Sequence, residues 1–248
     1  MSGRFVFTSV VDDAGPFDVV GDVHGCFDAL RRLCADLGYD SELRHPSRKL
    51  VFVGDLINRG PDSVDVVRTV IRLVGEGRAY RVLGNHDDAM RDWLAGGAEE
   101  RKLGLEKTID AIDSQPGSEK LWGQIRELFN TAPIVLRLDS GRLVVAHAGI
   151  EEKMFGCVDD ETRRFILHGD EIGKSPEGKT LRRDWAGDYR GDAFVVYGHT
   201  PCTRPEIRNN TVNIDQGAYR GGFLTALRWP ERVTLSVPSG FTQVRMAC

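Results

Sequence analysis

The chain has few cysteines, and none of them has the spacing of a metal-binding or redox pair. Five cysteines are scattered through 248 residues, and no CxxC occurs. An odd, scattered set argues against a disulfide framework and fits a reducing compartment, so we expect a cytoplasmic protein. We interpret the thiols as small apolar packing groups. They are Cys26, Cys34, Cys157, Cys202 and Cys248.

Long apolar runs and a basic charge balance are also missing. No stretch approaches the roughly 18 apolar residues of a membrane span, and no apolar signal-peptide core opens the chain, so we expect no membrane segment. The formal net charge is −4, whereas proteins with large nucleic-acid footprints are usually basic. We therefore do not expect extended nucleic-acid binding. The phosphate-loop pattern GxxxxGKS/T does not occur, which excludes a kinase of that type.

Strands and helices alternate along the first third of the chain. Apolar runs at 17–22, 49–55 and 79–87 have the composition of buried strands. Segments with helical spacing of apolar residues separate them, at 26–38 and 61–77. This rhythm predicts a βαβαβ unit with a parallel sheet, so the expected fold class is α/β.

The remainder of the chain contains a second group of strands. A more polar segment at about 87–130 is expected to be helical and to form an insertion or cap. Strands follow at 133–149 and 193–238, on either side of a charged, irregular region at 151–192. Since no repeat or linker interrupts the pattern, we expect one domain over residues 1–248.

Acidic, amide and imidazole side chains follow five of these strands. The segments are GDVHG (21–25), GDLINRG (54–60), GNHD (84–87), AHAG (146–149) and YGHT (197–200). Because sites in open parallel sheets form at the carboxyl ends of strands, we expect these groups to meet at one edge. The candidate metal ligands are Asp22, His24, Asp55, Asn85, His147 and His199.

Six such ligands can hold two divalent ions if one carboxylate bridges them. Asp55 follows the middle strand and is the natural bridge. Oxygen and imidazole ligands without cysteine suit manganese, iron or zinc, and we take manganese as the first choice. Each motif alone is typical of an ordinary turn, but their combination predicts a two-metal centre. His45 and His168 lie away from the strand ends and are interpreted as surface residues.

These motifs, in this order, resemble the phosphoprotein-phosphatase branch of the binuclear metallophosphoesterases over about residues 17–237. The segments at 49–63, 188–201, 209–217 and 221–232 are most similar to the phosphatase domain of bacterial polynucleotide kinase-phosphatases. Symmetrical diadenosine tetraphosphatases are a second similar group. The resemblance implies a calcineurin-like domain, that is, a four-layer αββα sandwich with a helical insertion.

The resemblance also implies roles for single residues. It assigns to one metal Asp22, His24 and Asp55, and to the other Asp55, Asn85, His147 and His199. Arg59 would bind the phosphate, His86 would protonate the leaving group, and Asp215 would lie at the edge of the site. From the residues themselves, Arg183 is a candidate second phosphate ligand, with a solvated charge run as the alternative. Trp185 is a candidate for stacking on a base, although packing at the rim is the simpler interpretation.

Asn58 marks a departure from the branch. Protein phosphatases have an aspartate at this position, and that acid pairs with the motif histidine. Asn58 can hydrogen-bond His86 but supplies no charge, so His86 should be a weaker proton donor near neutral pH. A strong donor matters least when the leaving group is a phosphate or nucleotide, so this departure favours nucleotide or anhydride substrates.

The residues and the resemblance together predict a divalent-metal-dependent hydrolase of phosphate esters or anhydrides. A water molecule activated by the metals would attack the phosphorus in line, without a covalent intermediate. The expected substrate is a phosphorylated small molecule or nucleotide end: a phosphomonoester, a cyclic phosphate or a dinucleoside polyphosphate. A bacterial Ser/Thr protein phosphatase and an inactive phosphate-binding module of the same fold are the alternatives.

Overall fold

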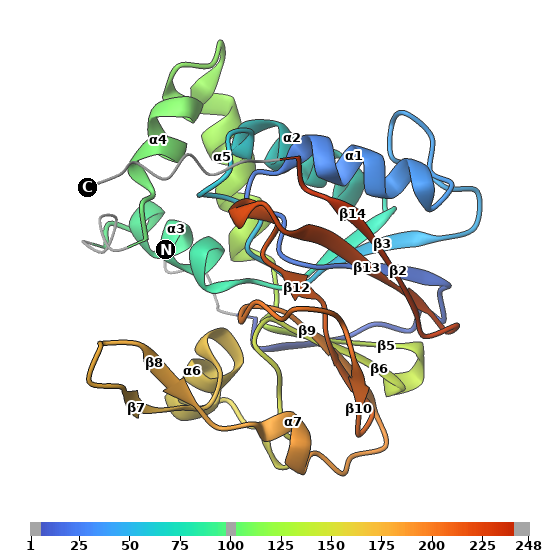
Figure 1. Cartoon of the computed structure of the whole chain (residues 1–248). Helices are drawn as coiled ribbons and strands as arrows, with labels where there is room; N and C mark the ends of the chain where they lie inside the picture. Colours follow the sequence, from blue (N-terminus) through green and yellow to red (C-terminus); the bar gives the residue numbers. More distant parts are fainter. Residues whose placement is uncertain (1–5, 98–102, 241–248) are drawn as a thin grey trace.

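The structure is a computed structural model of the chain, and it describes residues 6–97 and 103–240. Within these residues, two six-stranded sheets pack face to face (Figure 1). The first sheet has the order β12-β13-β2-β3-β4, with β14 beside β13, and β2, β3 and β4 are parallel. Its strands are β2 (Phe17–Val20), β3 (Lys49–Phe52), β4 (Ala79–Arg81), β12 (Asp215–Gln216), β13 (Phe223–Trp229) and β14 (Val233–Pro238).

The second sheet has the order β1-β5-β6-β9-β11-β10. Strands β6, β9 and β11 run parallel, whereas β5 is antiparallel to β6. The strands are β1 (Thr8–Val10), β5 (Val135–Leu138), β6 (Leu143–Ala146), β9 (Phe194–Tyr197), β10 (Ile207–Arg208) and β11 (Thr211–Asn213). The chain therefore contributes its first βαβαβ unit to one sheet and most of its middle strands to the other.

Alternate residues of each strand fill the space between the sheets. Phe17 and Val19 of β2 belong to this inner core, whereas Val20 packs in the core under the helices. On the other sheet, Leu143 and Val145 of β6 face inward. Successive side chains of a strand point to opposite faces. Since both faces are covered, the strands appear in the sequence as nearly continuous apolar runs.

Helices cover the outer faces of both sheets (Figure 1). Helices α1 (Phe27–Asp36) and α2 (Ser63–Gly75) lie over the first sheet, and α6 (Asp160–His168) and α7 (Trp185–Asp188) lie on the outer side of the second. This arrangement is the four-layer αββα sandwich that the sequence predicted. None of the helices among the described residues has the length and apolar character needed to cross a membrane.

The segment predicted as a helical insertion contains three helices within its described part. They are α3 (Asn85–Leu94), α4 (Glu106–Asp113) and α5 (Ser118–Asn130). The chain leaves β4 at Arg81 and enters α3 at Asn85. The GNHD motif, predicted as a strand end, therefore begins a helix. The buried face of α4 includes Thr108 and Ile112.

The region at 151–192, predicted to be irregular, is largely ordered into short elements, which corrects the sequence interpretation. It contains α6, α7, the 3₁₀ turn η2 (Glu152–Met154) and a hairpin of β7 (Glu171–Lys174) and β8 (Thr180–Arg182). Helix α6 has a recognisable start, because the side chain of Asp159 accepts a hydrogen bond from the backbone N–H of Thr162 at 2.7 Å. Further 3₁₀ turns are η1 (Asp139–Gly141) and η3 (Ala218–Arg220).

The cysteines that the structure describes are free. Cys26 and Cys34 are buried in the core, and burial raises the pKa of the Cys26 thiol to about 12. Cys157 and Cys202 are half-buried. These four therefore match the prediction of isolated thiols, whereas Cys248 lies outside the described residues.

Candidate metal centre and active site

The predicted metal ligands meet where the two sheets join. Asp22 and His24 follow β2, Asp55 follows β3, and Asn85 opens α3 just after β4. The other two ligand positions come from the second sheet, His147 after β6 and His199 after β9. We expected one edge of a single parallel sheet. The structure instead brings together the strand ends of two sheets, because β6 and β9 are parallel and end on the same side as β2 and β3.

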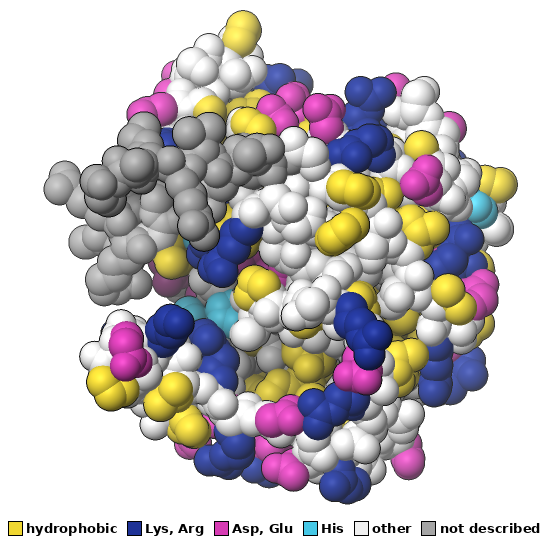
Figure 2. All heavy atoms as spheres, viewed as in Figure 1, with side chains coloured by type: hydrophobic (Ala, Val, Ile, Leu, Met, Phe, Trp, Pro, Cys, Tyr) yellow, Lys and Arg dark blue, Asp and Glu magenta, His cyan; other side chains and the backbone are white. Residues whose placement is uncertain are grey.

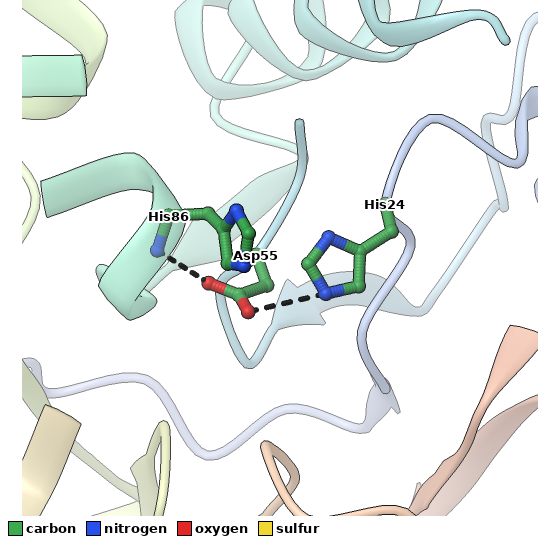
Figure 3. A group of neighbouring side chains, drawn as sticks. All are labelled: His24, Asp55 and His86. Carbon is green, nitrogen blue, oxygen red and sulfur yellow. Dashed lines mark hydrogen bonds and ion pairs between the residues drawn. The ribbon is translucent and has the colours of Figure 1, made fainter. Parts of the chain in front are cut away.

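The Asp55 carboxylate lies at the middle of the cluster. One oxygen, Oδ2, is 3.2 Å from His24 Nε2 and 3.5 Å from His147 Nε2. The other oxygen, Oδ1, accepts a hydrogen bond from the backbone N–H of His86 at 2.9 Å. Figure 3 shows the carboxylate between the rings of His24 and His86. Asp55 therefore contacts side chains from both sheets.

Backbone carbonyls fix the orientation of two histidine rings. His24 Nδ1 lies 2.8 Å from the carbonyl oxygen of Ile57, and His147 Nδ1 lies 2.9 Å from that of Val53. Only a protonated ring nitrogen can bond a carbonyl, so each neutral ring has its lone pair on Nε2. In both residues Nε2 faces Asp55.

A second group of atoms of metal-binding types converges beside Asp55. His147 Nε2, His199 Nδ1 and Asn85 Oδ1 lie 3.0–3.1 Å from one another. Arg182 donates to His199 Nε2, so the neutral His199 ring has its hydrogen on Nδ1, where it can bond Asn85 Oδ1 or His147 Nε2. A divalent cation bound by these three atoms would replace that hydrogen. Imidazole nitrogens with carboxylate and amide oxygens form a typical set of transition-metal ligands. The residues present therefore fit a divalent metal site.

Two glycines make room for the carboxylates. A Cβ atom on Gly84 would overlap Asp55 Oδ1, and one on Gly198 would overlap Asp22 Oδ1. The backbone of the ligands is itself unusual, because Asp55 and His199 have φ angles of 50° and 71°. Left-handed conformations at non-glycine residues cost free energy and are concentrated at functional sites.

Three buried acids give this region a negative potential. Burial raises the pKa of Asp22 well above its usual value, and the charges of Asp215 and Asp55 raise it further. Burial also raises the pKa of Asp215, whose carboxylate accepts a hydrogen bond from the backbone N–H of Gly217 at 2.8 Å. For Asp55 burial acts in the same direction, but the neighbouring histidines outweigh it and lower the pKa. A cation would relieve the repulsion among the acids.

His86 lies next to this cluster and touches two residues of the GDLINRG motif. The side-chain nitrogen of Asn58 is 2.9 Å from His86 Nδ1. The guanidinium of Arg59 reaches the other ring nitrogen, with Nε and Nη2 at 3.2 and 3.0 Å from His86 Nε2. Burial and, secondarily, the nearby positive groups lower the pKa of His86 to about 3, against the opposing effect of Asp55.

Tyr219 is a neighbour that sequence reasoning missed. Its ring centroid lies 4.4 Å from the guanidinium carbon of Arg59, a cation–π contact, and 4.8 Å from the ring centroid of His24. Tyr219 lies in η3, a few residues after the Asp215 motif. The sequence did contain one signal for Tyr219: it follows Asp215 closely, and Asp215 was expected at the edge of the site.

The structure separates Arg183 from the site and places its neighbour there. The side chain of Arg183 is 61% exposed and pairs with Asp170 at 3.5 Å. Arg182 Nη2 instead lies 3.1 Å from His199 Nε2, and its Nε donates to the carbonyl oxygen of His168 at 2.9 Å. Adjacent side chains of an extended segment point to opposite sides, so only one of the two arginines can face the histidines.

The other two histidines differ from the surface residues that we expected. His168, at the end of α6, is half-buried, and its ring centroid is 6.2 Å from that of His199. Burial lowers the pKa of His168. His45, in the segment before β3, is also partly buried, and its ring centroid lies 5.1 Å from that of Tyr39. His168 is therefore a site neighbour that the strand-end rule did not reveal.

Trp185 has the packing role that was the simpler of its two interpretations. It is 5% exposed, and its ring centroid lies 4.9 Å from that of Tyr197 and 6.1 Å from that of Phe165.

In the space-filling view, histidine side chains lie in a hollow with Lys and Arg side chains on both sides (Figure 2). This charge pattern suits an anionic substrate.

Comparison with known proteins agrees with the site. The family of calcineurin-like phosphoesterases matches residues 15–222. The asymmetrical bis(5′-nucleosyl)-tetraphosphatase PrpE of Anoxybacillus flavithermus is 46% identical over 90% of this chain and 94% of its own length. The enzyme of the same name from Geobacillus thermodenitrificans is 44% identical over 92% and 96%.

A solved structure adds a similar result. The crystal structure of a candidate diadenosine tetraphosphatase is 26% identical, with a TM-score of 0.71, and covers 94% of this chain and 98% of that one. Our sequence analysis had pointed to symmetrical enzymes of this kind, whereas both curated relatives are named as asymmetrical. The chain belongs to the calcineurin-like phosphoesterases, a family of metallophosphoesterase hydrolases, as its strand-end motifs had predicted.

Proposed function

We propose that this phosphoesterase hydrolyses dinucleoside polyphosphates at a two-metal centre bridged by Asp55. The observation that carries the proposal is the convergence of potential metal ligands around the Asp55 carboxylate, between two arginines. The names of the curated relatives support the substrate class. Manganese is the ion that we expect from the ligand set.

The proposed ligands divide between two ions. The first ion would be held by Asp22, His24 and Asp55, and the second by Asp55, Asn85, His147 and His199. Divalent ions in such a pair activate a water molecule and neutralise phosphate charge. The protein supports these ligands through the carbonyls of Ile57 and Val53, which fix the ring orientation of two of the histidines.

Two arginines would hold the substrate phosphate from opposite sides. Arg59 lies on the His86 side of the cluster and Arg182 on the His199 side. Each guanidinium contacts a ring nitrogen, a weaker partner than a charged phosphate oxygen, so an incoming phosphate can take over these hydrogen bonds. Arg182 replaces Arg183 in this proposal, because the Arg183 side chain points away.

His86 is positioned to assist the leaving group. Its backbone N–H donates to Asp55 and its buried ring contacts Arg59, so a phosphate held by Arg59 would have an oxygen within reach of His86 Nε2. Without an acid at position 58, His86 should be a modest proton donor. A nucleoside polyphosphate leaves readily with little protonation, so this site suits anhydride substrates better than alkyl esters.

The bond that is cut follows from the relatives' names. An asymmetrical enzyme cleaves the four-phosphate bridge away from its centre, so a dinucleoside tetraphosphate should give a nucleoside triphosphate and a nucleoside monophosphate. Symmetrical cleavage would give two diphosphates. Product identity therefore separates the two modes.

A substrate panel tests this proposal. Purified protein with added Mn²⁺ would be assayed on diadenosine tetraphosphate, a 3′-nucleotide, a 2′,3′-cyclic nucleotide, a phosphoserine peptide and p-nitrophenyl phosphate. We expect the highest kcat/KM on diadenosine tetraphosphate, with ATP and AMP as products. A clear preference for the phosphopeptide would instead make this chain a protein phosphatase.

A further inference from the structure

The turn that follows β12 carries an arginine to the edge of the site. Arg220 is the last residue of η3, and its side chain is exposed. Asp215 Oδ1 accepts a hydrogen bond from the Gly217 N–H at 2.8 Å, and the Arg220 N–H donates to the Gly217 carbonyl at 2.9 Å. Gly217 and Gly221 flank η3 with left-handed φ angles of 66° and 84°, which glycine adopts without strain. The turn therefore fixes the backbone position of Arg220.

The ring of Tyr219 connects Arg220 to Arg59. The guanidinium carbons of Arg59 and Arg220 lie 4.4 and 5.0 Å from the Tyr219 ring centroid. Arg220 Nε also donates a hydrogen bond to the Tyr219 hydroxyl at 2.5 Å. Because both guanidinium groups contact one ring, they lie close enough together for neighbouring phosphates of one chain to reach both.

The stem of Arg220 lies near the opposite side of the site as well. A Cβ atom on Gly217 would be 3.6 Å from Pro201 Cβ and 3.9 Å from Arg220 Cβ and Cδ. Pro201 comes two residues after His199, a proposed metal ligand. Arg220 therefore lies at the rim, between the loop that carries Arg59 and the loop that carries His199.

The charge of Arg220 has no acidic partner among the residues that the structure describes. By contrast, Arg183 pairs with Asp170, and Arg208 pairs with Asp184. A guanidinium has five N–H donors, and the hydrogen bond to Tyr219 uses one of them. Two neighbouring cations repel each other, and an anion that contacts both removes the repulsion. Arg59 and Arg220 together therefore favour an anion with more than one charged group.

We propose that Arg220 binds a second phosphate group of a polyphosphate chain, while Arg59 binds the phosphate that reacts. This inference rests on the proposed function and extends it, because Arg220 then distinguishes a polyphosphate from a monoester. A monoester has a single phosphate, held by Arg59 and Arg182, and gains nothing from Arg220. Arg59 also contacts His86, which serves the leaving group in the proposed function. The phosphates that Arg220 holds are therefore those of the departing nucleotide.

Three variants test the role of Arg220. Arg220→Met removes the charge and keeps an unbranched stem, and Arg220→Lys keeps the charge. Arg68→Met is the matched control, because Arg68 is an exposed arginine on α2, over the outer face of the first sheet. Thermal unfolding of the three variants would show that each is folded.

The direct readout compares two inhibitors of p-nitrophenyl phosphate hydrolysis, inorganic phosphate and tripolyphosphate, with Mn²⁺ in excess. Arg220→Met should raise the inhibition constant of tripolyphosphate by about 10-fold and that of inorganic phosphate by no more than about twofold. Arg220→Lys should recover most of this loss, and Arg68→Met should match wild type. With diadenosine tetraphosphate, Arg220→Met should raise KM by about 10-fold and leave kcat within about threefold, because the lost contact forms in the ground state and the transition state alike.

Two results would overturn the inference. One is an unchanged inhibition constant for tripolyphosphate in Arg220→Met; the other is an equal rise for both inhibitors, which would mean a general defect of the site. A failure of the proposed function looks different, because wild-type protein would then not hydrolyse diadenosine tetraphosphate. The inhibitor comparison would still decide the role of Arg220. If wild type hydrolysed nothing, calorimetric titration of the Mn²⁺-loaded proteins with both inhibitors would make the same comparison.

Discussion

Asn58 is the residue at which this site departs from the protein phosphatases that its motifs resemble. Its amide contacts the ring of His86, where those enzymes have a carboxylate. The sequence analysis could expect the contact between Asn58 and His86. It could not predict that Thr108 would hydrogen-bond Asn58. Asn58 and Thr108 are 50 positions apart, and only the packing of α4 against the GDLINRG loop brings them together.

Replacing Asn58 with aspartate should change how the rate depends on pH. A carboxylate beside His86 favours the protonated ring and raises its pKa. A general acid works in its protonated form, below its pKa, so the basic limb of the pH–rate profile should move to higher pH. Asn58→Asp should also gain rate on alkyl phosphates and change little on phosphoanhydrides. The test is to measure kcat against pH on both substrate classes. A basic limb at the same pH in wild type and Asn58→Asp would contradict the prediction.

The two adjacent arginines allow a matched comparison. Arg182→Ala should lower kcat/KM by roughly 10² because it removes a charged contact to the phosphate. Arg183→Ala should leave it within about twofold, since an exposed ion pair contributes little. The measurement is steady-state hydrolysis of diadenosine tetraphosphate with metal content checked in both variants. If Arg183→Ala lost more kcat/KM than Arg182→Ala, Arg183 would be the phosphate ligand, as the sequence analysis expected.

This choice shows a limit of prediction from single residues. The sequence LRRDW places two arginines side by side, and the direction of each depends on the register of the β7–β8 hairpin. The six candidate metal ligands were easier to find. Each is a metal-binding residue type directly after an apolar strand, and that local pattern requires no knowledge of distant contacts.

Among the elements, most strands of the two large sheets and the first two helices were predictable because their period and composition are strong. Helix α6 was missed, although Asp159 caps it and apolar residues follow at 165–167. Its many charged residues hid that pattern. The β7–β8 hairpin had weaker signals, since all four residues of β7 are exposed and no apolar face marks them. Short exposed elements of this kind depend on tertiary contacts such as those of Arg182.

Gly84, the residue directly before α3, should be essential to the geometry of the site. In Gly84→Ala the new Cβ would overlap both the side chain and the backbone of Asp55, so the loop must shift. We expect loss of bound metal and a fall in turnover of about 10² or more. The measurements are metal content by mass spectrometry and turnover on the same sample.

Gly123→Ala is the control for this change. Gly123 lies within α5, and a Cβ there meets no atom within 4 Å. Alanine should stabilise the helix by about 0.5–1 kcal/mol and leave activity unchanged. Normal metal content and turnover in Gly84→Ala would show that the GNHD turn tolerates a side chain and that the close approach to Asp55 is unnecessary.

At the scale of the whole molecule, the proposed metals would join the two sheets. Ligands from β2 and β3 belong to one sheet, and ligands from β6 and β9 belong to the other. The sandwich architecture could be predicted through the family resemblance. Strand alternation alone predicted only a single parallel sheet, because periodicity does not say which strands pair.

Metal removal should therefore lower thermal stability. A ligand that binds only the folded state stabilises it by about 2.7 kcal/mol at 100 times its Kd. For a chain of this size, that corresponds to a shift in Tm of roughly 5–10 °C. We expect a chelator to lower the Tm by this amount and added Mn²⁺ to restore it. An unchanged Tm, with the loss of metal confirmed, would mean that the ions do not hold the sheets together.

The central claim is that Asp55 bridges two metal ions that carry out the hydrolysis. The most direct test measures metal content and diadenosine tetraphosphate turnover on the same samples of wild type and Asp55→Asn. We predict two ions per chain and active wild-type protein, and in the variant a loss of bound metal with turnover lower by at least about 10³. Two bound ions and near-normal turnover in Asp55→Asn would contradict the account.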